Sequence, residues 1–172
     1  MRALTLLTDL YRHMAWADAL VLTNVMENPE VERDQYLLLK LRHLHSVQRI
    51  FLDVWVGQSI EPKVADELDL AELVAFARET YEGAIRFLVS RTSTSLQDVI
   101  ELPWSKTAAE KLGFDVAEHS FADTFVQVPS HSSYHRGQIC ARLRELGIEP
   151  PMTDYIAWIW RHKPEAEWPE ES

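Results

Sequence analysis

Apolar residues recur along most of the chain with the 3.6-residue period of amphipathic helices. A first helix is predicted from Leu6 to Met26, because Asn28-Pro29 breaks the pattern there. A second is predicted from about Asp34 to Gly57, since a glycine followed by Pro62 is a typical stop signal. Each of these segments is long enough to cover one side of a helical core.

Two further helices follow the same period. The third begins at Asp69, which has the spacing of a capping box with Glu72, and continues to about Ser90. The fourth covers residues 121–146 and is stopped by a glycine and two prolines. Pro129 lies inside this fourth segment and removes one backbone amide, which predicts a kink or a restart of the helix.

The stretch from Arg91 to Ser120 has a different pattern. Thr and Ser cluster at 92–95, and residues 98–104 have strand-like content that a proline ends. A short β-hairpin or irregular excursion is predicted here. The fold class is therefore all-α, a four-helix bundle with this excursion between its third and fourth helices.

The end of the chain adds little to this core. A short segment is predicted from Asp154 to Arg161, and the acidic tail 165–172 is expected to be frayed. Residues 1–164 are expected to form one helical domain, which agrees with the total length of 172 residues.

The composition excludes several classes of partner and indicates the compartment. The formal charge of −10 has the wrong sign for attraction to phosphates or anionic lipid, so nucleic acid is not expected to bind. The single cysteine, Cys140, cannot form an internal disulfide, which favours a reducing compartment. Neither a signal-peptide pattern nor a run of about 18 uncharged apolar residues is present, so a cytoplasmic protein without membrane contact is expected.

Two histidines spaced four residues apart are the most informative pattern. On a helix His131 and His135 are separated by about 40° and one turn, so both can reach one metal ion. The spacing also fits a pair of partly buried, hydrogen-bonded histidines. Ser132 stands where a zinc protease of the HExxH class carries its glutamate base, which disfavours that class.

Such a pair needs another ligand, and the second helix offers His43 and His45. They lie about 200° apart, so only one can face the centre of the bundle. The positions around His45 include Arg49, whereas those within about 40° of His43 are uncharged: Tyr36, Leu39, Val47, Ile50 and Val54. This favours an inward His43, with His45 as the alternative. Either could instead be a core histidine bonded to a carbonyl.

The sequence also predicts structural roles for residues near these histidines. Arg136 is expected to pair with an acid such as Asp154 or Asp18 and to hold the helix end. Asp18 could instead position a ligand or water at the site. Gly137 predicts close approach of a neighbouring helix or subunit. Cys140, about 140° from His135, is expected to be a small buried apolar residue.

These residues together resemble the DinB/YfiT-like family. The ending HSSYHRGQICARLRELGIEPPMTDYIAW is similar to the family's signature helix, with a His, three residues, then His-Arg-Gly-Gln and a Leu-Arg-x-x-Gly stop. The N-terminal YRHMAWAD resembles its opening helix, where Asn is commoner than the Asp18 found here. In the second helix, Gln48 replaces an acidic residue of the family pattern and Phe51 replaces the usual Trp.

The resemblance implies a four-helix bundle that binds a divalent metal through three histidines, which would be His43, His131 and His135. Characterised relatives include transferases and an isomerase that use low-molecular-weight thiols such as bacillithiol, mycothiol or glutathione. We therefore expect a metal-dependent enzyme of the thiol transferase or hydrolase type, with zinc or nickel as cofactor because imidazole suits both.

The expected partners are a small-molecule substrate, which could be a thiol, and a second copy of the chain in a homodimer. The alternative is a non-catalytic helical bundle that dimerises or binds another partner. In that case the histidines would only be packed.

Overall fold

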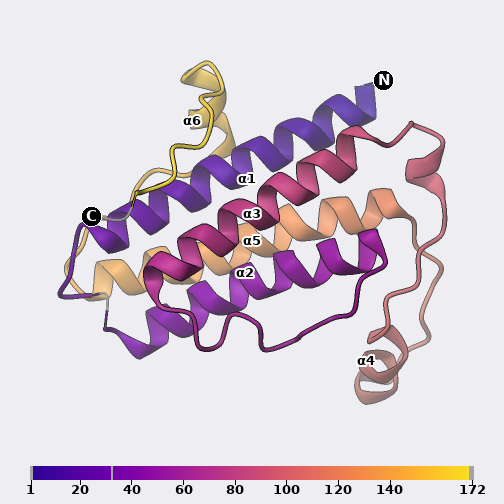
Figure 1. Cartoon of the computed structure of the whole chain (residues 1–172), viewed down its shortest axis with the longest axis horizontal. Helices are drawn as coiled ribbons and strands as arrows, with labels where there is room; N and C mark the ends of the chain where they lie inside the picture. Colours follow the sequence, from indigo (N-terminus) through magenta and orange to yellow (C-terminus); the bar gives the residue numbers. More distant parts are fainter. Residues whose placement is uncertain (1, 32, 171–172) are drawn as a thin grey trace.

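The computed structural model describes residues 2–31 and 33–170 and is all-helical over them (Figure 1). A short 3₁₀ turn, η1 (Ser95–Gln97), precedes the fourth α-helix. The α-helices are α1 (Arg2–Met26), α2 (Gln35–Val56), α3 (Leu70–Val89), α4 (Ser105–Leu112), α5 (Phe121–Glu145) and α6 (Tyr155–Trp160).

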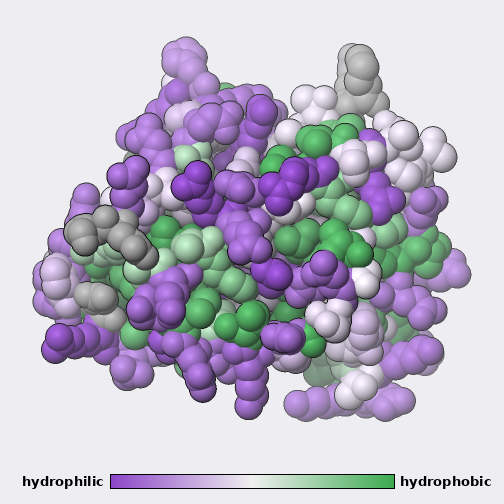
Figure 2. Space-filling view, viewed as in Figure 1, coloured by the Kyte–Doolittle hydropathy of each residue, from purple (hydrophilic) through white to green (hydrophobic). Residues whose placement is uncertain are grey.

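The four long helices pack lengthwise around one core. Both α1 and α2 lie against α3 and α5, so consecutive helices α1 and α2 lie across the core from each other (Figure 1). In Figure 1, α3 crosses in front of this core and α5 lies behind it. The space-filling view of the same side is mostly hydrophilic, with apolar groups gathering toward the right, where α2 and α3 end (Figure 2).

A layer of buried polar residues divides the core into two apolar clusters. One cluster takes residues from all four long helices, including Val21, Leu22, Leu41, Leu44, Leu73, Ile139 and Leu143. The other lies toward the opposite ends of the same helices and includes Leu7, Tyr11, Phe51, Trp55, Leu88, Phe125 and Val128. The residues between them, which we call the central polar layer, are Asp18, His45, Gln48, Ser132 and Arg136.

Side-chain caps fix where the helices begin and end. Asp34 accepts a hydrogen bond from the Leu37 amide at the start of α2, and Gly57 adopts a left-handed φ of 72° at its end. The predicted capping box of Asp69 and Glu72 is present at the start of α3. A second capping box, formed by Ser120 and Asp123, begins α5 and was not among the predictions, although the sequence has the required spacing.

Of the two forms predicted for residues 91–120, the β-hairpin is wrong, and the described chain instead follows an irregular path that includes η1 and α4. Between α3 and α5 the described chain forms one isolated antiparallel bridge, Val99 with Ser120. The Ile100 amide donates to the carbonyl of His119 beside it. The strand-like stretch goes no further, because Pro103 lacks an amide to donate and the chain turns into α4.

Two expectations about α5 also need correction. The helix continues without interruption through Pro129, so the predicted restart does not occur, and the alternative of a kink at Pro129 stays a prediction. A Cβ built on Gly137 would meet no atom within 4 Å, so no neighbouring helix of this chain approaches it closely. Cys140 is buried in an apolar cluster, as expected, and burial raises the pKa of its thiol.

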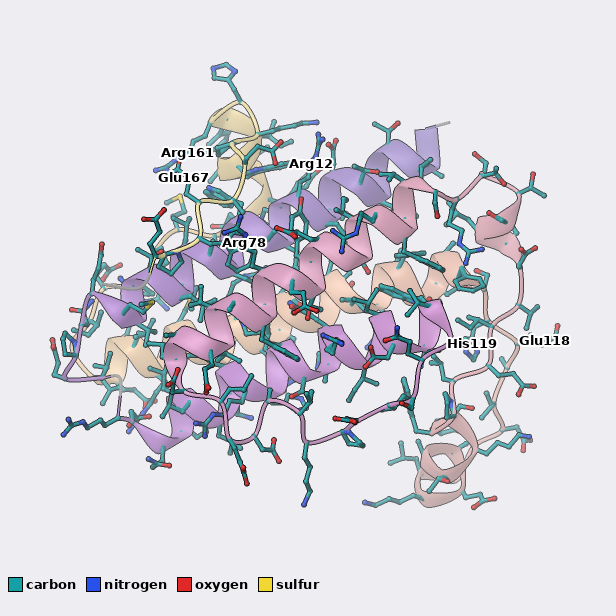
Figure 3. All side chains as sticks on the ribbon, viewed as in Figure 1. Arg12, Arg78, Glu118, His119, Arg161 and Glu167 are labelled. Carbon is teal, nitrogen blue, oxygen red and sulfur yellow. The ribbon has the colours of Figure 1, made fainter. Side chains whose placement is uncertain are left out.

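The C-terminal segment folds back over α1 and α3 (Figure 1). The indole N–H of Trp158 donates a hydrogen bond to the carbonyl of Pro164. The Lys163 ammonium forms an ion pair of 2.6 Å with the Asp9 carboxylate. Trp168 packs against the apolar core, and it lines a groove with Arg78 of α3. Figure 3 labels Arg78 on this helix and Glu167 in the tail. The fraying expected for the tail is therefore not seen in residues 165–170, and a domain boundary at residue 164 stays a prediction.

Across the described helices, none combines the length and apolar character needed to cross a membrane.

Replacing Trp168 with Ala tests whether the tail is part of the fold. We expect the free energy of unfolding to fall by about 1–2 kcal/mol, since a partly buried indole loses part of the packing of a fully buried one. Trp160→Ala is the matched control, because its side chain is 72% exposed and the expected change is about 0.5 kcal/mol or less. Equal values for both variants in urea denaturation would show that the tail contributes nothing.

Candidate metal centre

The helices α2 and α5 bring three histidines together. His43, His131 and His135 each offer a ring nitrogen, and these atoms all lie within 4.8 Å of one another. The ring centroids of His131 and His135 are 4.4 Å apart, and that of His43 is 4.5 Å from His135 and 5.5 Å from His131. Nitrogens on one tetrahedral zinc ion are about 3.4 Å apart, so small side-chain rotations would close the group around an ion. We call these residues the histidine cluster.

One ring nitrogen of the histidine cluster, the Nε2 atom of His131, is buried without a hydrogen-bond partner among the described residues. A buried polar atom left without a partner costs about 1–3 kcal/mol, so such atoms are rare unless a ligand or water satisfies them. A metal ion at the centre of the cluster would satisfy this nitrogen, and the residues present therefore fit such an ion.

Gln138 holds His135 in the form that binds a metal. The Nδ1 atom of His135 is 3.0 Å from the Oε1 atom of Gln138. Because this amide oxygen can only accept, Nδ1 carries the proton and Nε2 keeps its lone pair. Metal-binding histidines commonly have such a partner, which fixes both the tautomer and the ring orientation.

The electrostatic surroundings keep the cluster neutral. Burial, together with the nearby His135 and His43 rings, lowers the pKa of His131 to about 4. Burial also lowers the pKa of His43 and of His135, and the ammonium group of Lys40 lowers both further. All three imidazoles are therefore unprotonated near pH 7, which is the form that binds a metal.

His43 reaches the cluster from an exposed position, so the inward placement predicted for it is wrong. The uncharged stripe around His43 lies at the outer edge of α2, where Tyr36 is 45% and Leu39 61% exposed. His45 takes the inward position and is 1% exposed. The cluster therefore lies at the edge of the contact between α2 and α5.

The central polar layer lies in the core, on the inner side of the histidine cluster. The Nδ1 atom of His45 donates to the Oε1 atom of Gln48 at 3.0 Å. The amide nitrogen of Gln48 donates to Asp18 at 2.7 Å and to Ser132 at 3.0 Å. Arg136 donates to the other carboxylate oxygen of Asp18, and both side chains are 3% exposed. The predicted pairing of Arg136 with Asp18 is thus confirmed.

Hydrogen bonds between side chains set the register of α2 against α5. They lie at both ends and in the middle of the contact: Arg142 to Asp34 at 2.7 Å, Gln48 to Ser132 at 3.0 Å and Trp55 to Thr124 at 3.0 Å. The two helices therefore run antiparallel. A slip of one turn would displace one helix by about 5.4 Å and separate His43 from the two histidines of α5.

Gln48 and Gln138 have roles at the site that were not predicted from the sequence. Both belong to a His-x-x-Gln pattern, His45 with Gln48 and His135 with Gln138, and in both the ring Nδ1 bonds to the amide oxygen. The spacing of three residues puts the two side chains on one helix face. This repeated pattern was the available signal in the sequence.

Comparison with known proteins agrees with this architecture. The DinB family model matches residues 4–168, which includes both helices of the histidine cluster and confirms the resemblance described above. No curated protein matches the chain.

Replacing Arg136 with Met should destabilise the fold more than it weakens metal binding. The change leaves the buried Asp18 carboxylate without its cation, and breaking such a pair costs about 3–5 kcal/mol. Arg144→Met is the control, since Arg144 is an exposed arginine on the same helix. Urea denaturation and a competitive zinc titration would measure both effects. A loss of metal affinity that equals or exceeds the loss of stability would contradict a purely structural role.

Proposed function

The chain belongs to the DinB family, and from this premise we propose that it is a metal-dependent enzyme whose four-helix bundle holds a divalent ion between His43, His131 and His135. The observation that carries the proposal is the convergence of three unprotonated imidazoles, one with a buried and unpartnered nitrogen. His45 is not included, because its Nδ1 atom is bonded to Gln48 in the central polar layer.

Zinc and nickel are the ions that this donor set favours. Imidazole suits both metals, and the group offers no carboxylate or thiolate ligand. Three protein ligands also leave coordination positions free, which is typical of catalytic rather than structural zinc sites.

The proposed reaction is transfer of a thiol to an electrophilic carbon, or a hydrolysis. A bound ion would supply Lewis acidity and lower the pKa of a thiol or water beside it. Residues of the chain orient the metal ligands and leave access for a substrate. Gln138 orients the His135 ring, Gln48 ties α2 to α5, and the exposure of His43 leaves a side of the cluster open to small molecules. Homodimerisation through α2 stays a prediction.

Metal content of untagged protein is the direct test of this proposal. We expect close to one zinc or nickel ion per chain by plasma mass spectrometry, and loss of that ion in the His131→Ala, His135→Ala double variant. A folded wild-type protein that neither carries nor takes up a divalent metal would instead favour the non-catalytic bundle.

The third ligand can be tested by comparing two histidines of α2. His43→Ala should weaken zinc binding by at least about tenfold, since two imidazoles hold a divalent ion poorly. His45→Ala should change zinc affinity little, although it removes a buried hydrogen bond. Chelator competition measures both, with circular dichroism to confirm folding. Loss of the metal in a folded His45→Ala protein would refute the choice of His43.

A further inference from the structure

A cleft opens on the side of α5 that faces away from the histidine cluster. Gly137 follows His135 by two residues, so it lies about 200° around the helix from that histidine. The segment that leads from α5 to α6 covers this side of the helix and passes α1 (Figure 1). The cleft has a volume of about 490 Å³, and its walls include Gly137, His13, Arg136, Arg144, Asp154 and Tyr155.

Two buried polar side chains hold the walls of the cleft in place. The Nε2 atom of His13 donates to the carbonyl of Thr153 at 2.8 Å, which fastens the covering segment to α1. Arg136 donates to Asp18 from one nitrogen and to Ser133 at 3.2 Å from another. His13 is 6% and Arg136 3% exposed. The cleft is therefore formed by the fold itself, as is usual for binding sites of small molecules.

Gly137 leaves space in this cleft. Glycine inside a helix lowers stability relative to alanine, so its presence there needs a reason. Its φ is not in the left-handed region, so the backbone does not require glycine at this position. Close packing does not require it either, because a Cβ would meet no atom within 4 Å. A longer side chain here would enter the cleft, and space for a bound molecule would explain the glycine.

Opposite charges line the two sides of the cleft. Burial raises the pKa of the Cys140 thiol, and the guanidinium groups of Arg136 and Arg144 oppose this shift, so positive charge lies on the α5 side. Burial lowers the pKa of His13, and the Asp154 carboxylate is among the groups that oppose that shift. Negative charge therefore lies on the side of the covering segment.

The charges at the rim are free to bind a ligand. Neither Arg144 nor Asp154 has an ion-pair partner among the residues that the structure describes, and the two do not pair with each other. Asp154 is the N-cap residue of α6, yet its side chain accepts no capping hydrogen bond. Glu149 lines the cleft as well and adds a second carboxylate. A molecule that carries both a carboxylate and an ammonium group would compensate both signs of charge.

We propose that this cleft binds a small zwitterion of the α-amino-acid type. Its carboxylate pairs with Arg144, its ammonium group pairs with Asp154, and an apolar side chain packs beside Gly137 and Tyr155. Because Arg144 and Asp154 are exposed, each pair contributes modestly and the affinity is in the millimolar range. The inference does not depend on the proposed function, since the cleft shares no lining residue with the histidine cluster.

Three probes of similar shape and different charge test the ligand class. Heteronuclear NMR of the full chain follows titration with L-leucine, with 3-methylbutylamine, which lacks the carboxylate, and with 4-methylpentanoate, which lacks the ammonium group. L-leucine should shift the amide signals of Gly137, Arg144 and Tyr155. It should bind at least about threefold more tightly than either analogue, which is within the range of one exposed ion pair.

Charge variants assign each end of the ligand. Arg144→Gln should weaken binding of L-leucine about three- to fivefold and change binding of 3-methylbutylamine less than about twofold. Asp154→Asn should weaken binding of L-leucine by a similar factor and change binding of 4-methylpentanoate less than about twofold. Arg161→Gln is the control, because Arg161 is an exposed arginine at the other end of α6, outside the cleft (Figure 3).

A variant that fills the cleft separates binding from folding. Gly137→Leu should weaken binding of L-leucine at least about tenfold. The urea midpoint should be unchanged or higher, because leucine is a stronger helix former than glycine and a Cβ has room there. Ala141→Leu adds the same side chain at an exposed position of α5 outside the cleft, and should leave the affinity for L-leucine unchanged.

The possible failures are distinguishable. If wild type does not bind L-leucine, or if Gly137→Leu binds it as tightly as wild type does, the proposal is overturned. If either single-charge analogue binds as tightly as L-leucine, the zwitterion class is refuted. None of these outcomes bears on the metal content of the protein, which tests the proposed function separately.

Discussion

The buried ion pair between Arg136 and Asp18 is the interaction on which the rest of the structure depends. Two charges in an apolar core are tolerated only when each is paired and its remaining hydrogen-bonding capacity is used. Gln48 supplies this for Asp18 and links the pair to His45 and Ser132. Because α1, α2 and α5 must all meet at this layer, the core is divided into two apolar clusters, and each of these helices can take only one position along its axis.

The histidine cluster is a consequence of that register. His131 is adjacent in sequence to Ser132, and His135 to Arg136, so α5 presents its polar-layer residues to the core and its histidines to the edge facing α2. Two of the three departures from the family pattern, Asp18 and Gln48, are joined by a hydrogen bond of 2.7 Å from the Gln48 amide to the Asp18 carboxylate. An acid in α1 and an amide in α2 thus stand where the pattern that this chain resembles has an amide and an acid.

The sequence predicted the four long helices, the capping box at Asp69 and Asp18 as one of two partners for Arg136, because these follow from local periodicity and from the need to pair a charge. It did not predict α4, which lies in the stretch expected to be a hairpin or an irregular excursion. It did not predict that His43 is exposed. Periodicity describes one helix at a time and does not give the rotation of α2 against α5, which is set by side-chain contacts between distant residues. The same limit explains the hairpin error, since strand-like content between 98 and 104 has no partner strand of sufficient length.

Anomalous diffraction at the zinc absorption edge, from crystals of the zinc-loaded protein, would locate the ion. The register of α2 against α5 predicts a single strong peak at the edge of these helices, about 2.0–2.2 Å from one nitrogen each of His43, His131 and His135. A peak coordinated by the buried His45, or a zinc ion bound away from these three side chains, would contradict it.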